Sequence, residues 1–434
     1  MAASVKVALV VLAGAALRLG LFASGLDSYV QNRLEFITPL NSLQRLQESH
    51  FLYKAGLNPY AGDAFHQPPL VLVLYILLQA LTSVLHLRTL LYLSIVALDA
   101  VIAFGFASLC QAFLSTQAEQ QCERSKVWLN HPPVSPLLTP ENLPAMAAAM
   151  YLFNPYSLIS SLAMSTSIFT YAAVVWSLSF AMQGYLVHAI FFLSIATYLN
   201  VYPVVLLLPV LLMVHQARHA TSSPWSQATY LPLPRTAFSL ALFVASLGGW
   251  LALSHVFIGS WVFLDATYLW VLRYPDLTPN IGVFWYFFME LFDRFRNYFL
   301  FLLHLNPFLY VLPLYIRLRT RPLVYATVLL ALFSIFQAYP AFGDVGFVFT
   351  CCIMHPASIL GMQNKFVLAT GVVVTSVLMP VMAFLWLYPG SGNANFFYNQ
   401  TLIFQYFYVR GIAQFVTATL RRDKQLDEYF KLRN

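Results

Sequence analysis

Long runs of apolar residues recur along almost the whole chain, and each is about as long as one membrane-spanning helix. A helix needs about 20 apolar residues to cross a bilayer, and the runs supply roughly eleven to thirteen such spans. Charged residues make up only 9% of the 434 positions, whereas a water-soluble domain carries roughly a quarter. The sequence therefore predicts an all-α polytopic membrane protein in which residues 1–434 form a single transmembrane domain, with no room for a soluble catalytic domain.

The basic residues predict which segments face the cytoplasm. In a membrane chain the net charge of +7 marks cytoplasmic loops and is no sign of nucleic-acid binding. Three arginines cluster in the loop 317–322 and further basic residues follow in the tail 421–434, so we expect both to be cytoplasmic. Spans counted in the second half put the intervening polar turns on the other face, which is luminal for a chain held in the endoplasmic reticulum. The segments expected to be luminal are about 26–68, 272–298 and 389–399.

Prolines and polar residues divide the first half of the chain, whose topology the sequence leaves open. Leucine and phenylalanine recur at roughly helical spacing within 40–51, which predicts an interfacial helix. Residues 69–113 make either two spans or one span with a re-entrant piece. Residues 185–214 contain Pro203 and Pro209, so two short helices compete with one kinked helix.

Two charged residues lie inside expected spans. Arg18 lies near one end of the first span, where its long side chain either reaches the interface or pairs with a carboxylate inside the bundle. Asp99 lies in the second half of 69–113, and a carboxylate at that depth must face protein rather than lipid. Asp99 is therefore predicted to lie between helices, and Arg18 lies there too if it pairs with a carboxylate.

The polar stretch 273–296 stands out between apolar runs. Pro275 and Pro279 bracket Asp276, and each proline pushes the residue before it away from helical geometry, so Tyr274 and Thr278 should be extended. Five aromatic residues follow at 284–288, and amphipathic rings settle at the membrane–water interface. The stretch is predicted to form a rigid polar turn and an aromatic segment laid on one membrane face.

A second polar turn, 389–398, reads PGSGNANFFY. Its glycines permit a tight turn, and Asn393 and Asn395 offer amide donors and acceptors beside aromatic rings. Amides above an aromatic floor suit a sugar or phosphoethanolamine headgroup. From the residues alone, an ordinary surface turn with an aromatic belt remains the alternative.

Groups that could act in catalysis or bind a metal each have a simpler interpretation. Glu290 and Asp293, three residues apart on a helix, are typical of a solvated, charge-balanced face rather than an acid–base pair. Cys351 and the nearby His355 lie at or within a span, where an open nucleophilic site is not expected. No metal-ligand spacing links His50 or His66 to a carboxylate pair. The four cysteines are predicted to be small buried hydrophobes, namely Cys110, Cys122, Cys351 and Cys352.

The segment 274–288, which reads YPDLTPNIGVFWYFF, strongly resembles the U subunits (PIG-U) of the glycosylphosphatidylinositol (GPI) transamidase complex. Further matching motifs are spread over nearly the whole length of the chain, while the loops 114–144 and 215–235 and the C-terminal tail show no obvious match. These motifs are NPY at 58–60, LFNPY at 152–156, YP at 339–340 followed by GDV at 343–345, and NANFFY at 393–398.

The resemblance implies a multi-pass protein of the endoplasmic reticulum membrane. Its complex cleaves a C-terminal signal from a precursor and joins the new carboxyl end to a GPI lipid. In that family a cysteine-peptidase-like subunit performs the covalent chemistry, and the U subunit helps bind the lipid and scaffold the assembly, with no cofactor of its own. By analogy Asn393 and Asn395, with Phe396, would contact the lipid headgroup. The turn at Asp276 and Asn280, with Trp285, is a lesser candidate for the same contact and is otherwise structural or a contact with a partner subunit.

The same resemblance supplies a rival function. The family's fold looks like that of polytopic (GT-C type) glycosyltransferases that use dolichol-linked sugars, whose first luminal loop commonly carries an Asp-x-Asp pair. Here that loop has Asp27, and Glu35 stands well apart, so the paired carboxylates are missing. A lone Asp27 does not exclude the glycosyltransferase. That alternative predicts that Asp27→Asn alone abolishes function. A transporter ranks last, because only Arg18 and Asp99 stand out as charges within spans.

Overall fold

The computed structural model describes residues 2–83, 85–119, 138–219 and 231–431, and all regular structure among these residues is helical. The helices of the first half are α1 (Ala2–Ala23), α2 (Asp27–Val30), α3 (Leu43–Lys54), α4 (Pro69–Ala80), α5 (Leu87–Glu119), α7 (Leu143–Phe153), α8 (Pro155–Leu162), α9 (Ser167–Met182), α10 (Leu186–Leu199) and α11 (Leu207–His219). Those of the second half are α12 (Leu233–Ile258), α13 (Val262–Leu264), α14 (Trp270–Arg273), α15 (Phe284–Glu290), α16 (Asp293–Leu309), α17 (Val311–Leu318), α18 (Pro322–Phe336), α19 (Phe342–Ile353), α20 (Pro356–Leu360), α21 (Lys365–Leu387) and α22 (Ala394–Lys431).

Proline fixes where several of these helices begin. It is the first residue of α4, α8, α18 and α20, where its missing N–H would have no intrahelical acceptor and its fixed φ suits the helix. At the start of α8 the side chain of Asn154 also accepts a hydrogen bond from the Tyr156 N–H, at 3.1 Å. Cys122 lies outside the described residues, Cys110 and Cys351 are buried free thiols as predicted, and Cys352 is only partly buried.

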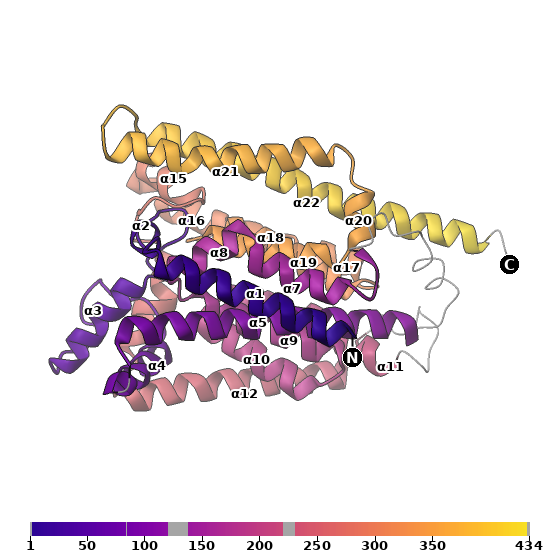
Figure 1. Ribbon diagram of the computed structural model, residues 1–434, viewed down its shortest axis with the longest axis horizontal. Helices are drawn as coiled ribbons and strands as arrows, with labels where there is room; N and C mark the ends of the chain where they lie inside the picture. Colours follow the sequence, from indigo (N-terminus) through magenta and orange to yellow (C-terminus); the bar gives the residue numbers. More distant parts are fainter. Residues whose placement is uncertain (1, 84, 120–137, 220–230, 432–434) are drawn as a thin grey trace.

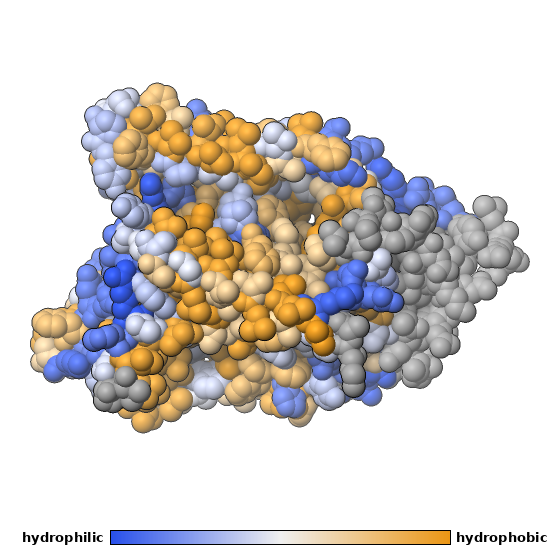
Figure 2. All heavy atoms as spheres, in the orientation of Figure 1, coloured by the Kyte–Doolittle hydropathy of each residue, from blue (hydrophilic) through white to orange (hydrophobic). Residues whose placement is uncertain are grey.

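Apolar residues cover much of the outside of the molecule, as expected for a chain that lies in a membrane (Figure 2). Among the described residues, five helical segments are long and apolar enough to cross a bilayer, and further apolar helices of 10–17 residues pack among them. The five segments are Ser4–Ala23, Leu87–Thr116, Leu233–Ile258, Asp293–Leu318 and Lys365–Leu387. The predicted all-α membrane fold is confirmed, while the count of eleven to thirteen spans stays a prediction.

The polar turns gather at one end of the helices. Figure 1 shows α2, α3, α15 and the turn between α21 and α22 at the left, with both chain termini at the right. The loop after α17 belongs to the other end, because Arg321 pairs with Asp423 near the end of α22, at 2.7 Å. The chain thus has two distinct polar ends separated by apolar helices.

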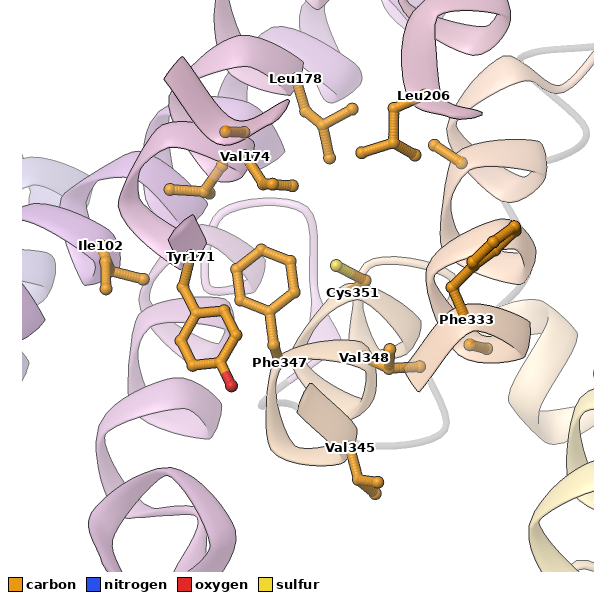
Figure 3. Close-up of a cluster of buried hydrophobic side chains, with 14 of the residues drawn as sticks. Ile102, Tyr171, Val174, Leu178, Leu206, Phe333, Val345, Phe347, Val348 and Cys351 are labelled. Atoms are coloured by element: carbon orange, nitrogen blue, oxygen red, sulfur yellow. The ribbon is translucent and has the colours of Figure 1, made fainter. Parts of the chain in front are cut away.

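Helices α1, α5, α7, α9 and α10 pack closely and are called the central bundle here. Side chains from α5, α9, α18 and α19 meet in one continuous core, in which the rings of Tyr171 and Phe347 stack at 5.3 Å (Figure 3). Arg18 of α1 pairs with Asp99 of α5 at 2.6 Å, and both side chains are fully buried. The hydroxyl of Tyr151, on α7, donates to the same carboxylate at 2.7 Å. Arg18 therefore pairs inside the bundle, which decides between its two predicted roles.

Most local predictions for the first half agree with the structure. A helix is present where one was predicted, as α3, while its location at the interface stays a prediction; residues 69–113 form two helices, α4 and α5. Residues 185–214 are divided at Asn200, and a short 3₁₀ turn, Tyr202–Leu206, precedes α11. Pro203 lies in this turn and Pro209 in the first turn of α11, so two helices form rather than one kinked helix.

Two local predictions for the second half are wrong. Tyr274 is not extended but left-handed, with a φ of 49°, because its ring is held in the core between neighbouring aromatic side chains. Glu290 and Asp293 do not share a helix, because α15 ends at Glu290 and α16 begins at Asp293. The chain is extended at Leu291 between the two helices.

Helices α21 and α22 form a C-terminal hairpin that stands apart from the central bundle. α21 packs mainly on α22, and α22 packs on α18 and α20. In Figure 2 the molecule is hollowed between the layer of α21 at the top and the helices beneath it. The hairpin contributes side chains such as Phe404 and Tyr408 to the continuous core, and it also forms one wall of a cavity.

Candidate functional site

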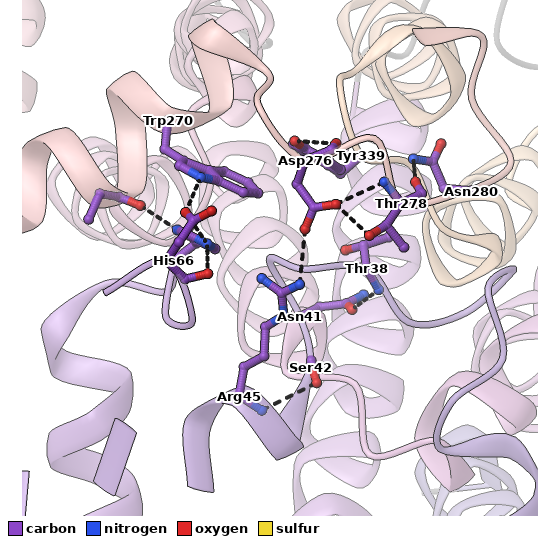
Figure 4. Close-up of polar contacts among 12 residues, drawn as sticks. Thr38, Asn41, Ser42, Arg45, His66, Trp270, Asp276, Thr278, Asn280 and Tyr339 are labelled. Atoms are coloured by element: carbon purple, nitrogen blue, oxygen red, sulfur yellow. Dashed lines mark hydrogen bonds and ion pairs between the residues drawn. The ribbon is translucent and has the colours of Figure 1, made fainter. Parts of the chain in front are cut away.

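The predicted polar turn at Asp276 is closed by its own side chain (Figure 4). The Asp276 carboxylate accepts hydrogen bonds from the Thr278 N–H, at 2.8 Å, and from the Thr278 hydroxyl. Arg45 of α3 donates to the other carboxylate oxygen at 2.9 Å. Burial acts to raise the pKa of Asp276, but the Thr278 hydrogen bonds and the Arg45 guanidinium together hold it below its usual value. Asp276 is thus an ionised residue that ties this turn to α3.

Asn280 is enclosed rather than open to a ligand. It is 1% exposed, its amide donates to the Thr278 carbonyl at 3.2 Å, and its carbonyl accepts from the Gly282 N–H at 2.8 Å. Arg296 donates to the Tyr274 carbonyl at 2.6 Å, which helps hold the left-handed residue in place. The hydrogen bonds of Asn280 therefore stabilise the conformation of the turn.

Stacked rings connect three loops at the same end of the molecule. His66 stacks on Trp270 with ring centroids 3.6 Å apart, Trp270 stacks on Tyr339 at 5.1 Å, and Tyr339 stacks on Tyr274 at 4.6 Å. The Tyr339 hydroxyl also donates to the Asp276 carbonyl at 3.0 Å. His66 is therefore a member of a ring stack, and among the described residues no three His, Cys, Asp or Glu side chains gather to hold a metal ion.

The structure brings the two predicted polar turns together. The Tyr286 hydroxyl of α15 donates to the Asn395 side-chain oxygen, and its ring stacks on Tyr398 at 4.5 Å. Gln405 of α22 donates to the Ile281 carbonyl at 2.9 Å. The stretch before α15 and the first turns of α22 are therefore one surface, although the sequence separates them by more than a hundred residues.

The predicted site residues in this surface differ in accessibility. Asn393, Asn395 and Phe396 are exposed, Phe396 by 51%. Trp285 is buried between Phe397 and Tyr398, and its indole N–H has no hydrogen-bond partner among the described residues. The aromatic segment 284–288 was predicted to lie at the interface, but Phe284, Trp285 and Phe288 are buried in the protein.

An apolar cavity of about 850 Å³ lies between the C-terminal hairpin and the helices that face it. Its walls come from α7, α8, α18, α19, α20, α21 and α22, with Phe36 and Phe342 at one end and Lys365 at the other. The polar groups of Tyr156 and Asn154 are satisfied within the protein, because Tyr156 bonds Ser376 at 2.6 Å and Asn154 donates to the Gly346 carbonyl at 3.2 Å. The cavity has the size and the apolar lining of a ligand pocket.

The carboxylates of the first loop are held in different ways. Asp27 is buried and accepts hydrogen bonds from Arg88 at 2.8 Å and from the Tyr92 hydroxyl at 2.9 Å. Glu35 is 1% exposed, and one of its carboxylate oxygens has no hydrogen-bond partner among the described residues. Asp27 therefore sits in a neutralised ion pair, whereas Glu35 lines the cavity.

Sequence reasoning missed the cavity and the residues that connect the two turns. Arg45 and Gln405 are single polar residues whose partners lie 231 and 124 positions away, so no spacing in the sequence links them. The two helices of the hairpin carry Gly371 and Gly411, which lie 40 residues apart in the sequence and differ in their surroundings. Only the fold shows that Gly371 lets Phe407 approach closely while Gly411 borders open space.

Comparison with known proteins places the chain in a family. The family model described as GPI transamidase subunit PIG-U matches residues 12–404. The GPI-anchor transamidase component PIGU of Homo sapiens is 33% identical over 422 residues, which cover 96% of this chain and 94% of the human protein. The GPI transamidase component GAB1 of Saccharomyces cerevisiae is 27% identical over 382 residues, which cover 87% and 85% of the two chains. The chain therefore belongs to the PIG-U family of GPI transamidase subunits.

Proposed function

We propose that this chain binds the GPI lipid and presents it for attachment to the C-terminus of precursor proteins within the transamidase complex. The observation that carries the proposal is the apolar cavity of about 850 Å³ behind the C-terminal hairpin. Exposed apolar cavity walls at membrane depth are filled by lipid chains, because neither water nor an empty space can satisfy them. The acyl chains of the GPI lipid would occupy the cavity.

The headgroup would lie over the joined surface of α15 and the start of α22. Asn393 and Asn395 offer exposed amides there, and Phe396 offers an exposed ring. The unpartnered indole N–H of Trp285 lies under the same turn, within reach of a headgroup that displaces a neighbouring ring. Asp276 and Asn280 would contribute through the shape of the neighbouring turn, since their side chains are already engaged.

The chemistry would reside on a cysteine-peptidase-like subunit of the complex rather than on this chain. In support, Asp27 is fully buried and ion-paired with Arg88, so it is not open to a substrate in the way that the glycosyltransferase alternative needs. The site at the α15 end would face the lumen of the endoplasmic reticulum, with 317–322 and the tail from 421 in the cytoplasm. A fold shared with GT-C type glycosyltransferases, and eleven to thirteen spans, remain part of this proposal.

Two variants test the cavity and the turn separately in cells that lack the endogenous subunit. Gly411→Phe fills the cavity from α22, where an added side chain meets open space. The matched control is Gly248→Phe on the exposed face of α12, where the added side chain also meets nothing. Asn393→Leu with Asn395→Leu removes the amides, and the exposed Asn399→Leu on α22 is its control.

We expect Gly411→Phe and the double asparagine variant to lower surface GPI-anchored protein, measured by flow cytometry, while the complex still co-purifies. Both controls should leave the surface signal unchanged. Normal surface levels in Gly411→Phe would reject the cavity as the lipid site. Normal levels in the double variant would reject only the headgroup contact.

A further inference from the structure

Glu35 is a buried carboxylate at one end of the lipid cavity. It lies in the loop between α2 and α3, and its own carbonyl accepts a hydrogen bond from the Phe342 N–H at 2.9 Å. The ring of Phe342 packs against Phe404 of α22 at 5.2 Å, so this loop, the start of α19 and the hairpin meet at Glu35. The side chain is 1% exposed and lines the cavity.

Among the described residues, the Glu35 carboxylate has no ion pair, unlike two other buried carboxylates. Asp99 pairs with Arg18 and Asp27 pairs with Arg88, although one oxygen of Asp27 also has no hydrogen-bond partner there. Glu35 has an oxygen, Oε1, without any hydrogen-bond partner among the described residues, and it is the one cavity-lining residue there with an orphaned side-chain atom. A buried polar group left unpaired costs free energy that a bound partner can recover.

The missing partner is a hydrogen-bond donor, and its charge can be inferred from the surroundings. Burial in an apolar setting raises the pKa of Glu35, and a hydrogen bond with its own backbone and the positive charge of Arg33 only partly oppose this effect. A cation placed against Oε1 would stabilise the ionised form and satisfy the orphaned oxygen at once. Lys365 cannot supply that cation, because it lies at the other end of the cavity and donates to the Leu360 carbonyl at 2.9 Å.

We propose that Glu35 receives a primary ammonium group of the lipid headgroup and so selects amine-bearing lipids for the cavity. The inference rests on the proposed lipid-binding function and adds the group that is recognised. Acyl chains would enter between α21 and α19, and the ammonium would lie at the cavity end that is lined by Phe36 and Phe342. Phosphoethanolamine is a group of this kind, whether it is carried by a GPI lipid or by phosphatidylethanolamine.

The test uses the intact transamidase complex purified with wild-type or variant chain in mild detergent. The probe is a synthetic GPI lipid with a photoreactive acyl chain, prepared either with free primary amines or with all amines acetylated. Labelled peptides of α21 and α22 are quantified by mass spectrometry. The variants are Glu35→Gln, which keeps the shape of the side chain, and Glu48→Gln, a matched control on the exposed surface of α3.

Wild type and Glu48→Gln should be half-labelled at a roughly tenfold or more lower concentration of the free-amine lipid than of the acetylated lipid, as a charge-assisted hydrogen bond predicts. In Glu35→Gln the two lipids should label alike. Retained discrimination in Glu35→Gln overturns the assignment, even though lipid binding itself then stands. Absence of hairpin labelling by either lipid in wild type overturns the proposed function as well.

A competition arm identifies the source of the ammonium. Unlabelled phosphatidylethanolamine and phosphatidylcholine are added at equal concentration against the free-amine GPI probe. Weak competition by both supports recognition of the GPI headgroup. If phosphatidylethanolamine displaces the probe as well as unlabelled GPI lipid does, the pocket is a site for an ordinary membrane lipid, and selection of the GPI headgroup by Glu35 is overturned.

Discussion

In the central bundle, α5 and α9 lie so close that a methyl group added to Gly105 would come within 2.7 Å of Val175, whereas a methyl group added to Gly411 of α22 would meet nothing. The two regions thus differ in what fills the space between helices. In the bundle it is protein, with a buried ion pair between α1 and α5. Behind the C-terminal hairpin it is an apolar cavity. The comparison teaches that close packing and open apolar space are found between different helices of one chain.

The contrast extends to the polar groups in each region. The carboxylate of Asp99 is matched by an arginine and a tyrosine inside the bundle, which leaves no reason for a ligand to enter. Glu35 faces the cavity with an oxygen that the protein does not satisfy. Both oxygens of Asp99 are bonded and stabilise the fold, although the Nη2 atom of Arg18 beside it has no hydrogen-bond partner among the described residues; an unsatisfied oxygen such as that of Glu35 can instead stabilise a complex with a ligand.

The largest effect is expected from Asp99→Asn, which leaves the Arg18 charge buried without a partner. Removal of one member of a buried ion pair costs about 3–5 kcal/mol. The apparent melting temperature of the detergent-solubilised complex, followed by fluorescence size-exclusion chromatography, should fall sharply. Asp265→Asn is the control, because Asp265 pairs with Arg273 on the surface and such pairs contribute about 1 kcal/mol or less. Equal melting temperatures of the two variants would contradict the rigid role of the bundle.

The next largest effect comes from the same glycine-to-alanine substitution made once in the central bundle and once in the hairpin. Gly105→Ala places a methyl group against Val175 in the bundle, and Gly371→Ala places one against the Phe407 ring inside the hairpin. Overpacking costs about 1–3 kcal/mol in each case. Hydrogen exchange should increase across α5, α7 and α9 in Gly105→Ala, but only in α21 and α22 in Gly371→Ala. Increased exchange of the bundle in Gly371→Ala would show that the hairpin and the bundle unfold as one unit.

Local features of these two regions could be predicted from the sequence, and the contacts between distant segments could not. Pro203 and Pro209 indicated a possible break within 185–214, and the apolar surroundings of Asp99 required it to face protein. These inferences depend on a residue and its immediate neighbours. The partner of Asp99 is 81 positions away, and nothing in the pattern around Arg18 selected pairing over exposure at the interface.

The candidate site shows the same limit more clearly. The sequence identified both polar turns, because proline, glycine and asparagine cluster there for local reasons. It did not show that Tyr286 would bond Asn395 across 109 positions, nor that packing of Tyr274 would override the extended geometry that Pro275 favours. A cavity is harder still to predict, since it depends on where side chains from seven helices stop short of one another.

A smaller effect of opposite sign is expected at Gly411. Gly411→Ala adds a methyl group over open space and restricts the unfolded chain, so it should stabilise α22 by about 0.5–1 kcal/mol. The same substitution at Gly105 is destabilising, which makes the pair a direct readout of how each region is packed. Melting temperatures of the two variants should move in opposite directions. A drop for Gly411→Ala would mean that the hairpin closes on the bundle in the membrane.

The smallest effect concerns the pair of Asp276 and Arg45, which links the polar turn to α3 and lies outside both regions. Because the pKa of folded Asp276 is below its usual value, the pair contributes stability above the unfolded pKa of about 4, and loses it as the pH falls through the lower, folded value. Asp276→Asn should therefore lower the melting temperature near neutral pH by an amount that matches about 1 kcal/mol or less, and the difference from wild type should vanish once the pH is below the folded pKa of Asp276. Hydrogen exchange of α5 and α21 should not change. A difference that persists in acid would mean that Asp276 acts through its backbone turn with Thr278 rather than through its charge.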